Sequence, residues 1–251
     1  HIRVAAYPGE SDWTAWAAAF PECVARWNGG LRLGGMKIFL DGSPQGRTAW
    51  LRRPYEGEAE YAGYPTMTDE AVVQVMRRCA EAGLQLLVHC NGDAAAEQML
   101  RCAGQVQAET GRLAATRPVM IHAQLLGTDQ AARLKPLGII PSFFVAHVYH
   151  WGDVHRRNLG EARAAHISPA GTALRCDLPF TFHQDAPVIP PDIVWGGAGP
   201  GGGGRSRMGC AEGRDGERGL RLFRGAGGRH PRPRQARRPG AAGQGSAAHP
   251  A

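Results

Sequence analysis

Five short apolar segments recur along residues 35–184 of this 251-residue chain, and stretches with helical signals separate them. The apolar segments are 35–40, 84–90, 118–123, 139–145 and 180–184. In the first intervening stretch, apolar residues follow helical spacing between Thr68, a favourable N-cap, and Gly83, a favourable C-cap. Strands that alternate with helices across short loops predict a parallel sheet with right-handed crossover connections.

The spacing of the segments narrows the fold to two classes. Helices are expected at 68–83, 94–110, 129–137, 159–165 and 170–175. Most strand segments are apolar at consecutive positions, which is typical of strands buried on both faces. The pattern fits an open doubly wound sheet or half of a (β/α)8 barrel, and both place function at the carboxyl ends of the strands. The absence of a glycine-rich phosphate loop after the first strand segment argues against a nucleotide-binding doubly wound fold.

Four polar residues lie inside or at the ends of these strand segments: Lys37, His89, His122 and Asp185. A lysine in a buried strand is rare unless its charge is paired or removed, and carbamylation would convert Lys37 into a carboxylate able to bridge two cations. Two imidazoles and a carboxylate match the ligand preferences of zinc. Any one of these residues alone is explained as well by a structural role. Their shared location predicts a metal centre.

Six segments, in order, resemble the metal-dependent amidohydrolases of the amidohydrolase-3 type, a branch that includes N-substituted formamide deformylases. The segments are GMKIFLDGSPQGRTA, VHCNGDAA, IHAQ, SFFVAHVYHWGD, LGEARAAHISPAGTAL and FHQDAPVIPPD. The resemblance covers about residues 1–192. It implies an α/β fold, a partial (β/α)8 TIM-type barrel of the metal-dependent hydrolase kind that contains about strands 4 to 8.

The resemblance also implies one or two divalent metal ions, usually zinc, and a role for each strand-end residue. Lys37 matches the fourth-strand lysine of the family, and His89 and His122 match the fifth-strand and sixth-strand ligands. Asp185 matches the eighth-strand aspartate, which is both metal ligand and general base. The chain departs from the family at Ile121, where a glutamate is common, and it lacks the first-strand His-x-His pair, which we expect upstream of His1.

Several loop residues are candidates for substrate contact. Asp41 and Arg47 flank the loop after the Lys37 strand, but a turn residue and a surface charge explain them equally well. A loop after the 139–145 strand is expected to carry further candidates, and His183 lies two residues before Asp185, on the same side of the strand. The loop candidates are His147, His150 and Trp151.

The predicted function is metal-dependent hydrolysis of carbon–nitrogen bonds other than peptide bonds, in a small amide or formamide. Asp185 would take a proton from the attacking water and deliver it to the leaving amine. The alternative is a non-catalytic module that binds nucleic acid through a basic tail. That charge is local, since residues 193–251 hold 11 Arg and three acidic residues, whereas the remainder holds 18 basic and 19 acidic residues. With two aromatic residues in the tail, binding to nucleic acid is not favoured.

The glycine-rich and arginine-rich segment 193–251 is interpreted as a shifted reading frame, and we expect it to be disordered. Reading 210–223 and 234–250 from the second base of each codon permits segments that resemble those this family places after its last catalytic strand. We expect the chain as written not to be a competent hydrolase, because the first-strand histidine pair lies outside it.

Three further features bear on location and partners. The six cysteines show no metal-type spacing, which is typical of reduced thiols in the cytoplasm. No apolar run reaches the roughly 18 residues of a membrane-spanning helix, and no secretory signal is recognised, so a cytoplasmic protein without a membrane partner is expected.

Overall fold

The computed structural model of the protein describes residues 2–190. The chain divides into two units, residues 1–216 and 217–251, and all described residues belong to the first. The tail expected at 193–251 lies outside the described residues.

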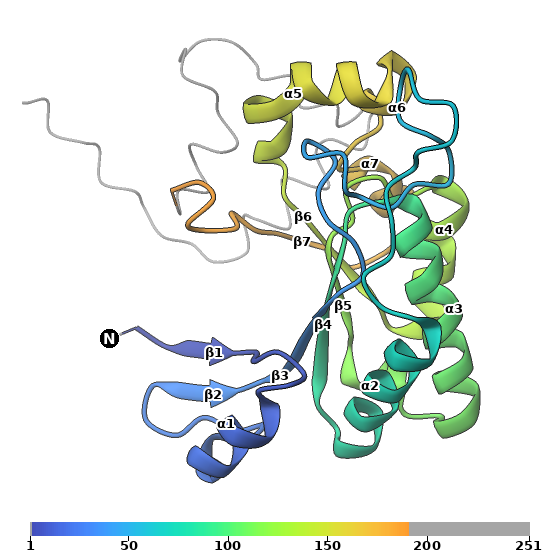
Figure 1. Cartoon of the computed structure of the whole chain (residues 1–251). Coiled ribbons are helices and arrows are strands. Elements are labelled where there is room, and N and C mark those ends of the chain that lie inside the picture. Colours follow the sequence, from blue (N-terminus) through green and yellow to red (C-terminus); the bar gives the residue numbers. More distant parts are fainter. Residues whose placement is uncertain (1, 191–251) are drawn as a thin grey trace, which may run out of the picture. The chain divides into compact units, whose positions relative to one another are not determined.

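A five-stranded parallel sheet forms the centre of the described fold, and its strands are paired in the order in which they follow along the chain (Figure 1). The strands are β3 (Gly35–Phe39), β4 (Gln85–Cys90), β5 (Val119–His122), β6 (Ile140–Phe143) and β7 (Thr181–Phe182). Phe39 is paired with His89, and His122 is paired with both Cys90 and Phe143. The parallel α/β class is therefore confirmed, and the register brings the carboxyl ends of the strands to one edge.

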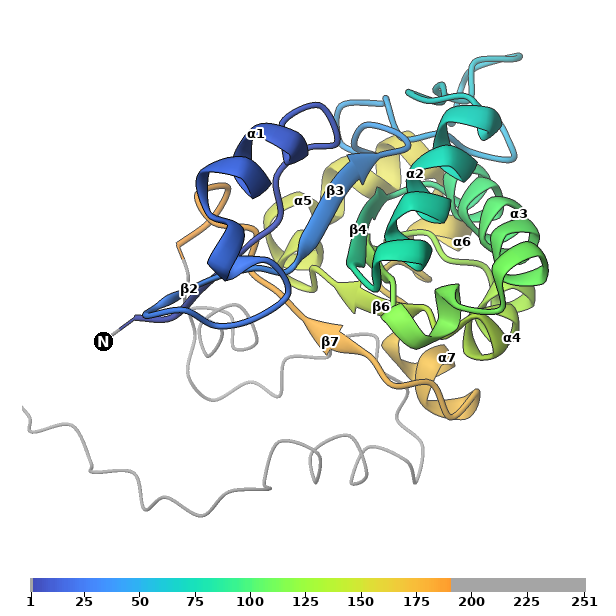
Figure 2. The ribbon, with the colours of Figure 1, turned by 90° about the horizontal axis from the view of Figure 1, so that it is seen from below.

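Three helices cover one face of this sheet (Figures 1 and 2): α2 (Asp69–Ala82), α3 (Asp93–Thr110) and α4 (Thr128–Leu134). Helix α2 begins at the expected cap, where the Thr68 hydroxyl accepts a hydrogen bond from the Ala71 N–H at 3.3 Å, and Gly83 ends it in the left-handed conformation. Met76, Leu86 and Met120 are fully buried between helices and sheet, and each contributes about 1.5–3 kcal/mol to folding. No helix within residues 2–190 is both long and apolar enough to span a membrane.

The burial of the strands differs from the expectation that they are covered on both faces. In β4 buried residues alternate with partly exposed ones, so that Leu86 and Val88 face the helices while Leu87 and His89 face away. The expectation is wrong for this strand because, within the described residues, helices pack against only one face of it. Strand β6 is buried at all four positions, as expected.

A second, two-stranded parallel sheet precedes β3 and was not predicted from the sequence. It consists of β1 (Val4–Ala6) and β2 (Leu31–Leu33), joined through α1 (Trp13–Ala19) and the short 3-10 helix η1 (Pro21–Cys23). Three-residue strands are too short to show a period. The Lys37 N–H donates to the Pro8 carbonyl at 2.9 Å, so the chain after β1 also runs beside β3.

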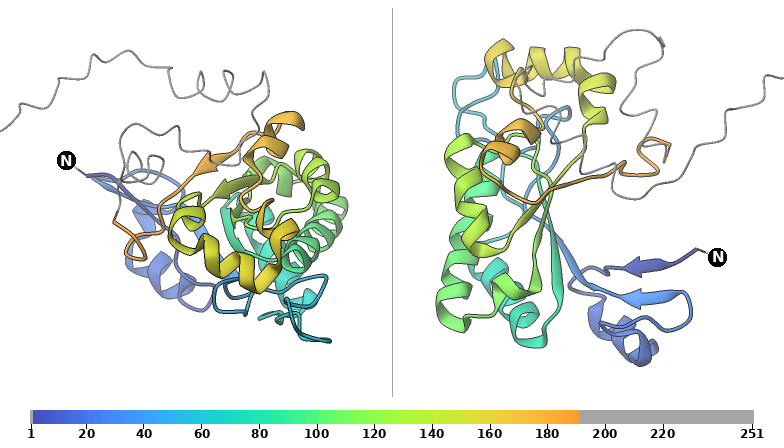
Figure 3. Two further views of the ribbon diagram at one scale, coloured as in Figure 1. Left: turned by 90° about the horizontal axis from the view of Figure 1, so that it is seen from above. Right: turned by 180° about the vertical axis from the view of Figure 1, so that it is seen from behind.

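The remaining elements are two short 3-10 helices before β5 and β6 and three helices between β6 and β7. The 3-10 helices η2 (Leu113–Thr116) and η3 (Lys135–Leu137) precede β5 and β6. Helices α5 (Ala146–Leu159) and α6 (Glu161–Ala164) lie beyond the carboxyl ends of the strands, and α7 (Ala170–Arg175) leads into β7 (Figure 3). The prediction of a loop around residues 147–153 is therefore wrong, because α5 occupies these positions. The prediction that a helix begins at residue 159 is also wrong, because α5 ends there and α6 begins at Glu161. Helix α5 was not predicted because its sequence, rich in aromatic residues and histidines, has no clear apolar period. A kink at Trp151 also interrupts its helical backbone.

An ion-pair network between α3 and α4 provides a test of stability. The Glu97 carboxylate accepts hydrogen bonds from Arg52 at 2.6 Å and Arg133 at 2.8 Å, and these partners lower the pKa of Glu97 to about 2. A lowered carboxyl pKa stabilises the fold above the ordinary value near 4.5, and this contribution is lost as the pH falls toward about 2. We expect Glu97→Gln to lower the free energy of unfolding by about 1 kcal/mol at pH 7 and by less at pH 3. Urea unfolding at both pH values would measure this, and an equal deficit at both would contradict it.

Candidate metal centre

His122 ends β5 in an uncommon backbone conformation. Its φ is +72°, and that of the following Ala123 is +46°, in the left-handed region that non-glycine residues rarely adopt. His122 is 4% exposed, so its imidazole lies among the strand ends and away from solvent. Strained backbone of this kind is concentrated at functional sites.

His183 and Asp185 reach His122 from the segment directly after β7. The His183 N–H donates to the Phe143 carbonyl at 3.1 Å, which extends the pairing of β7 with β6. His183 Nε2 lies 3.2 Å from His122 Nδ1. Asp185 has a φ of +54°, and the possible ligand atoms of His122, His183 and Asp185 all lie within 4.8 Å of one another. Two imidazoles and a carboxylate at this spacing form a candidate site for a divalent metal.

His89 adjoins this group from the end of β4. Its ring centroid lies 4.6 Å from that of His122. His89 Nε2 lies 2.9 Å from the Gly42 carbonyl oxygen, which can only accept a hydrogen bond. Asn91 Nδ2 lies 3.1 Å from the same Nε2, so both contacts are made by Nε2 and Nδ1 is the ring nitrogen left for a metal.

Lys37 lies beside the same histidines, on β3. Its ammonium group is 4.9 Å from the centre of the Phe39 ring. Burial is the main cause that lowers the pKa of His89 and of His122, and the Lys37 charge adds a smaller effect in the same direction. The chain thus brings Lys37, His89, His122 and Asp185 to one edge of the sheet. The three side chains whose possible ligand atoms lie within 4.8 Å of one another, however, are His122, His183 and Asp185, and this group does not include Lys37 or His89.

Burial keeps the imidazoles of this centre neutral. It lowers the pKa of His122 far below its ordinary value, and the neighbouring imidazoles lower it further. Burial likewise lowers the pKa of His183 to about 4 and that of His147 to about 3. Neutral imidazoles retain the lone pair that binds a metal, and Asp185 supplies an anionic oxygen. The residues present therefore fit a divalent cation.

Asp41, one of the candidates for substrate contact, has its carboxylate engaged by backbone groups. Its side chain is fully buried, and its oxygens accept hydrogen bonds from the backbone N–H groups of Trp50, Asn91 and Gly92 at 3.0, 2.9 and 2.7 Å. Burial raises the pKa of Asp41 to about 7 against the opposite effect of these donors. Asp41 therefore joins the loop after β3 to the loop after β4, beside His89.

Arg47, the other candidate on this loop, is engaged by a carboxylate and an aromatic ring. It pairs with Glu58 at 2.7 Å, and its guanidinium lies 5.3 Å from the centre of the Tyr55 ring. These contacts hold the tip of the loop after β3.

The candidate substrate residues after β6 separate into two groups. The ring centroid of His147 lies 6.5 Å from that of His122 and 4.8 Å from that of Trp151, so both adjoin the centre. His150 is exposed and contacts the Trp151 ring.

Two buried polar residues around the centre were not predicted. Ser142 Oγ lies 2.9 Å from His183 Nδ1, and His155 Nε2 lies 3.0 Å from His147 Nδ1. Ser142 is a lone hydroxyl in an apolar strand, which is a detectable signal. The contact of His155 with His147 depends on the course of α5, which is kinked between them at Trp151, so the sequence spacing does not reveal it.

Comparison with known proteins shows the family of the chain. A model of the amidohydrolase family matches residues 1–199. The chain therefore belongs to the amidohydrolase family. It is 31% identical over 185 residues to YtcJ of Bacillus subtilis (strain 168), covering 70% of this chain and 34% of that protein. It is also 31% identical over 134 residues to the protein LONG AFTER FAR-RED 3 of Arabidopsis thaliana, covering 53% of this chain and 23% of that protein.

Two solved structures are similar in fold. Both are described as uncharacterized metal-dependent hydrolases. The one from Pyrococcus furiosus has a TM-score of 0.63 and 28% identity, covering 76% of this chain and 38% of its own. The one from Pyrococcus horikoshii OT3 has a TM-score of 0.62 and 26% identity, covering 76% and 37%. The chain thus spans about a third of the length of these relatives.

Proposed function

We propose that the protein to which these residues belong is a metal-dependent hydrolase of carbon–nitrogen bonds in small amides or N-substituted formamides. The five parallel strands would be part of a (β/α)8 barrel. The observation that carries the proposal is the grouping of His122, His183 and Asp185 within 4.8 Å, with the His89 ring beside it. The family match and the two metal-dependent hydrolases of similar fold support it.

Each residue has a defined task in this proposal. His122, His183 and Asp185 would hold a zinc ion, with His89 Nδ1 as a further ligand. A bound zinc ion would acidify a water molecule and polarise the substrate carbonyl. Asp185 would accept the proton of the attacking water and pass it to the leaving amine. His147 and Trp151 would contact the substrate, and a carbamylated Lys37 would supply an additional carboxylate for a second metal.

Zinc binding tests the centre without requiring turnover. We expect the chain, stripped of metal and dialysed against zinc, to retain zinc, and we expect His122→Asn and Asp185→Asn to weaken retention by at least tenfold, since each removes one of few ligands. The matched control is Asp177→Asn, because Asp177 is an exposed carboxylate paired with Lys135. Elemental analysis after equilibrium dialysis gives the metal content. Equal zinc retention by Asp185→Asn and Asp177→Asn would contradict the site.

A further inference from the structure

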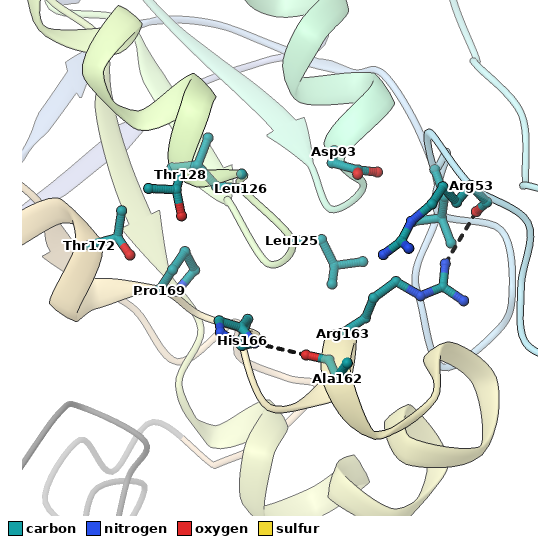
Figure 4. Close-up of a pocket in the computed structure, with 12 residues that line it drawn as sticks. Arg53, Asp93, Leu125, Leu126, Thr128, Ala162, Arg163, His166, Pro169 and Thr172 are labelled. Atoms are coloured by element: carbon teal, nitrogen blue, oxygen red, sulfur yellow. Dashed lines mark hydrogen bonds between the residues drawn. The ribbon is translucent and has the colours of Figure 1, made fainter.

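A cavity of about 280 Å³ lies between the loops that follow β3, β4 and β5 and the segment that contains α6 and α7 (Figure 4). None of His122, His183 and Asp185 lines it. Its volume is at the low end of ligand pockets, which span roughly 300–1,000 Å³, so it suits a small ligand.

Two arginines provide the positive charge of this cavity. Arg163 Nε donates to the Leu159 carbonyl at 2.6 Å, and Arg163 Nη1 donates to the Arg53 carbonyl at 3.2 Å. These bonds fix the guanidinium, whose third nitrogen has only a distant contact with Glu56 at 4.0 Å. The Arg53 guanidinium makes no hydrogen bond or ion pair with any of residues 2–190. Burial, followed by the charge of Arg53, lowers the pKa of Arg163 against the opposite effect of Glu56 and Asp93.

Aliphatic residues line the middle of the cavity, and the polar residues Asp93, Thr128, His166 and Thr172 complete its wall. Leu51, Leu125, Leu126 and Pro169 contribute aliphatic surface. Figure 4 shows Leu125 between the two arginines on one side and Thr128 and Thr172 on the other. The arginines therefore occupy one end of a pocket with an apolar middle.

We propose that this cavity binds a small monoanion that carries a carboxylate on an apolar body. A planar carboxylate matches the paired donors of a guanidinium, and the leucines accommodate the body. Asp93 also lines the cavity, and only its Oδ1 accepts a hydrogen bond, from the Arg52 N–H at 2.9 Å. This carboxylate disfavours a dianion such as phosphate. The proposal does not depend on the metal centre.

Titration calorimetry of the metal-stripped chain, with the chelator removed, tests the proposal. The probes are hexanoate, 1-hexanol and inorganic phosphate, which separate carboxylate, apolar and dianion recognition. The variants are Arg53→Gln and Arg163→Gln, and the matched control is Arg157→Gln, an exposed arginine that does not line the cavity. Thermal unfolding is recorded for each. Because the Arg53 guanidinium holds no described group in place, Arg53→Gln is the variant expected to keep the native fold.

We expect hexanoate to bind, and each of Arg53→Gln and Arg163→Gln to weaken that binding by roughly tenfold, since each loses a charge-assisted hydrogen bond. Arg157→Gln should bind hexanoate as the unaltered chain does. Equal affinity of the unaltered chain and Arg53→Gln for hexanoate would overturn the proposal. So would affinity for 1-hexanol or phosphate equal to that for hexanoate.

Discussion

Replacement of Asp185 by asparagine is expected to reduce kcat/KM for amide or formamide hydrolysis by a factor of roughly 10²–10⁴. Asp185 is the anionic member of the group that includes His122 and His183, and asparagine is a neutral, nearly isosteric substitute that cannot accept the proton of the attacking water. The left-handed φ of +54° at Asp185 is also tolerated by asparagine, so the substitution should leave the backbone in place.

The assay uses whichever form of the protein shows zinc-dependent turnover, the 251-residue chain or a form extended to the length of its relatives. Zinc is supplied at saturating concentration, so that loss of proton transfer is separated from loss of metal. Asp177→Asn is the matched control, since the Asp177 side chain is 94% exposed. Turnover by Asp185→Asn within threefold of that by Asp177→Asn would refute the assignment of Asp185 as the base.

The parallel sheet, and the edge at which its polar residues gather, were predictable because each rests on a local pattern. Lys37, His89 and His122 are polar residues inside apolar segments, and parallel strands bring their carboxyl ends together. Thr68 and Gly83 are capping signals that act within one turn of a helix, and both occupy the predicted positions.

The features that were missed depend on contacts between distant segments. The burial of Asp41 requires the loops after β3 and β4 to meet, and a turn of sequence Asp-Gly carries no sign of this. The left-handed backbone of His122 could not be predicted from residue type, because histidine adopts it more often than most residues do but still in a small minority of cases. His183 was placed on the correct side of its strand, but its distance from His122 depends on how closely β7 follows β6 and β5.

The Asp41 side chain joins the loops that carry His89, and its replacement should destabilise the fold more than replacement of Glu97 does. Its two oxygens accept three backbone N–H groups, and each buried donor left without an acceptor costs about 1–3 kcal/mol. Asparagine retains one acceptor oxygen, but its NH₂ group replaces the other oxygen and would face a backbone N–H group, so that two donors meet without an acceptor. Gly92 restricts any rearrangement, because a Cβ there would lie 1.8 Å from the Trp50 carbonyl oxygen and the loops already touch.

We therefore expect Asp41→Asn to lower the free energy of unfolding by roughly 2–4 kcal/mol at pH 8, where Asp41 is ionised, whereas Asp153→Asn, at a 95% exposed carboxylate, should leave it within about 0.5 kcal/mol. The pH dependence has a defined sign. The folded pKa of about 7 lies above the ordinary value of 3.8, so ionisation of Asp41 costs the native protein stability as the pH rises between these values, and asparagine does not ionise. The deficit of Asp41→Asn should consequently be larger at pH 5 than at pH 8. Urea unfolding at both pH values measures it, and a deficit like that of Asp153→Asn would show that the three N–H groups find other acceptors.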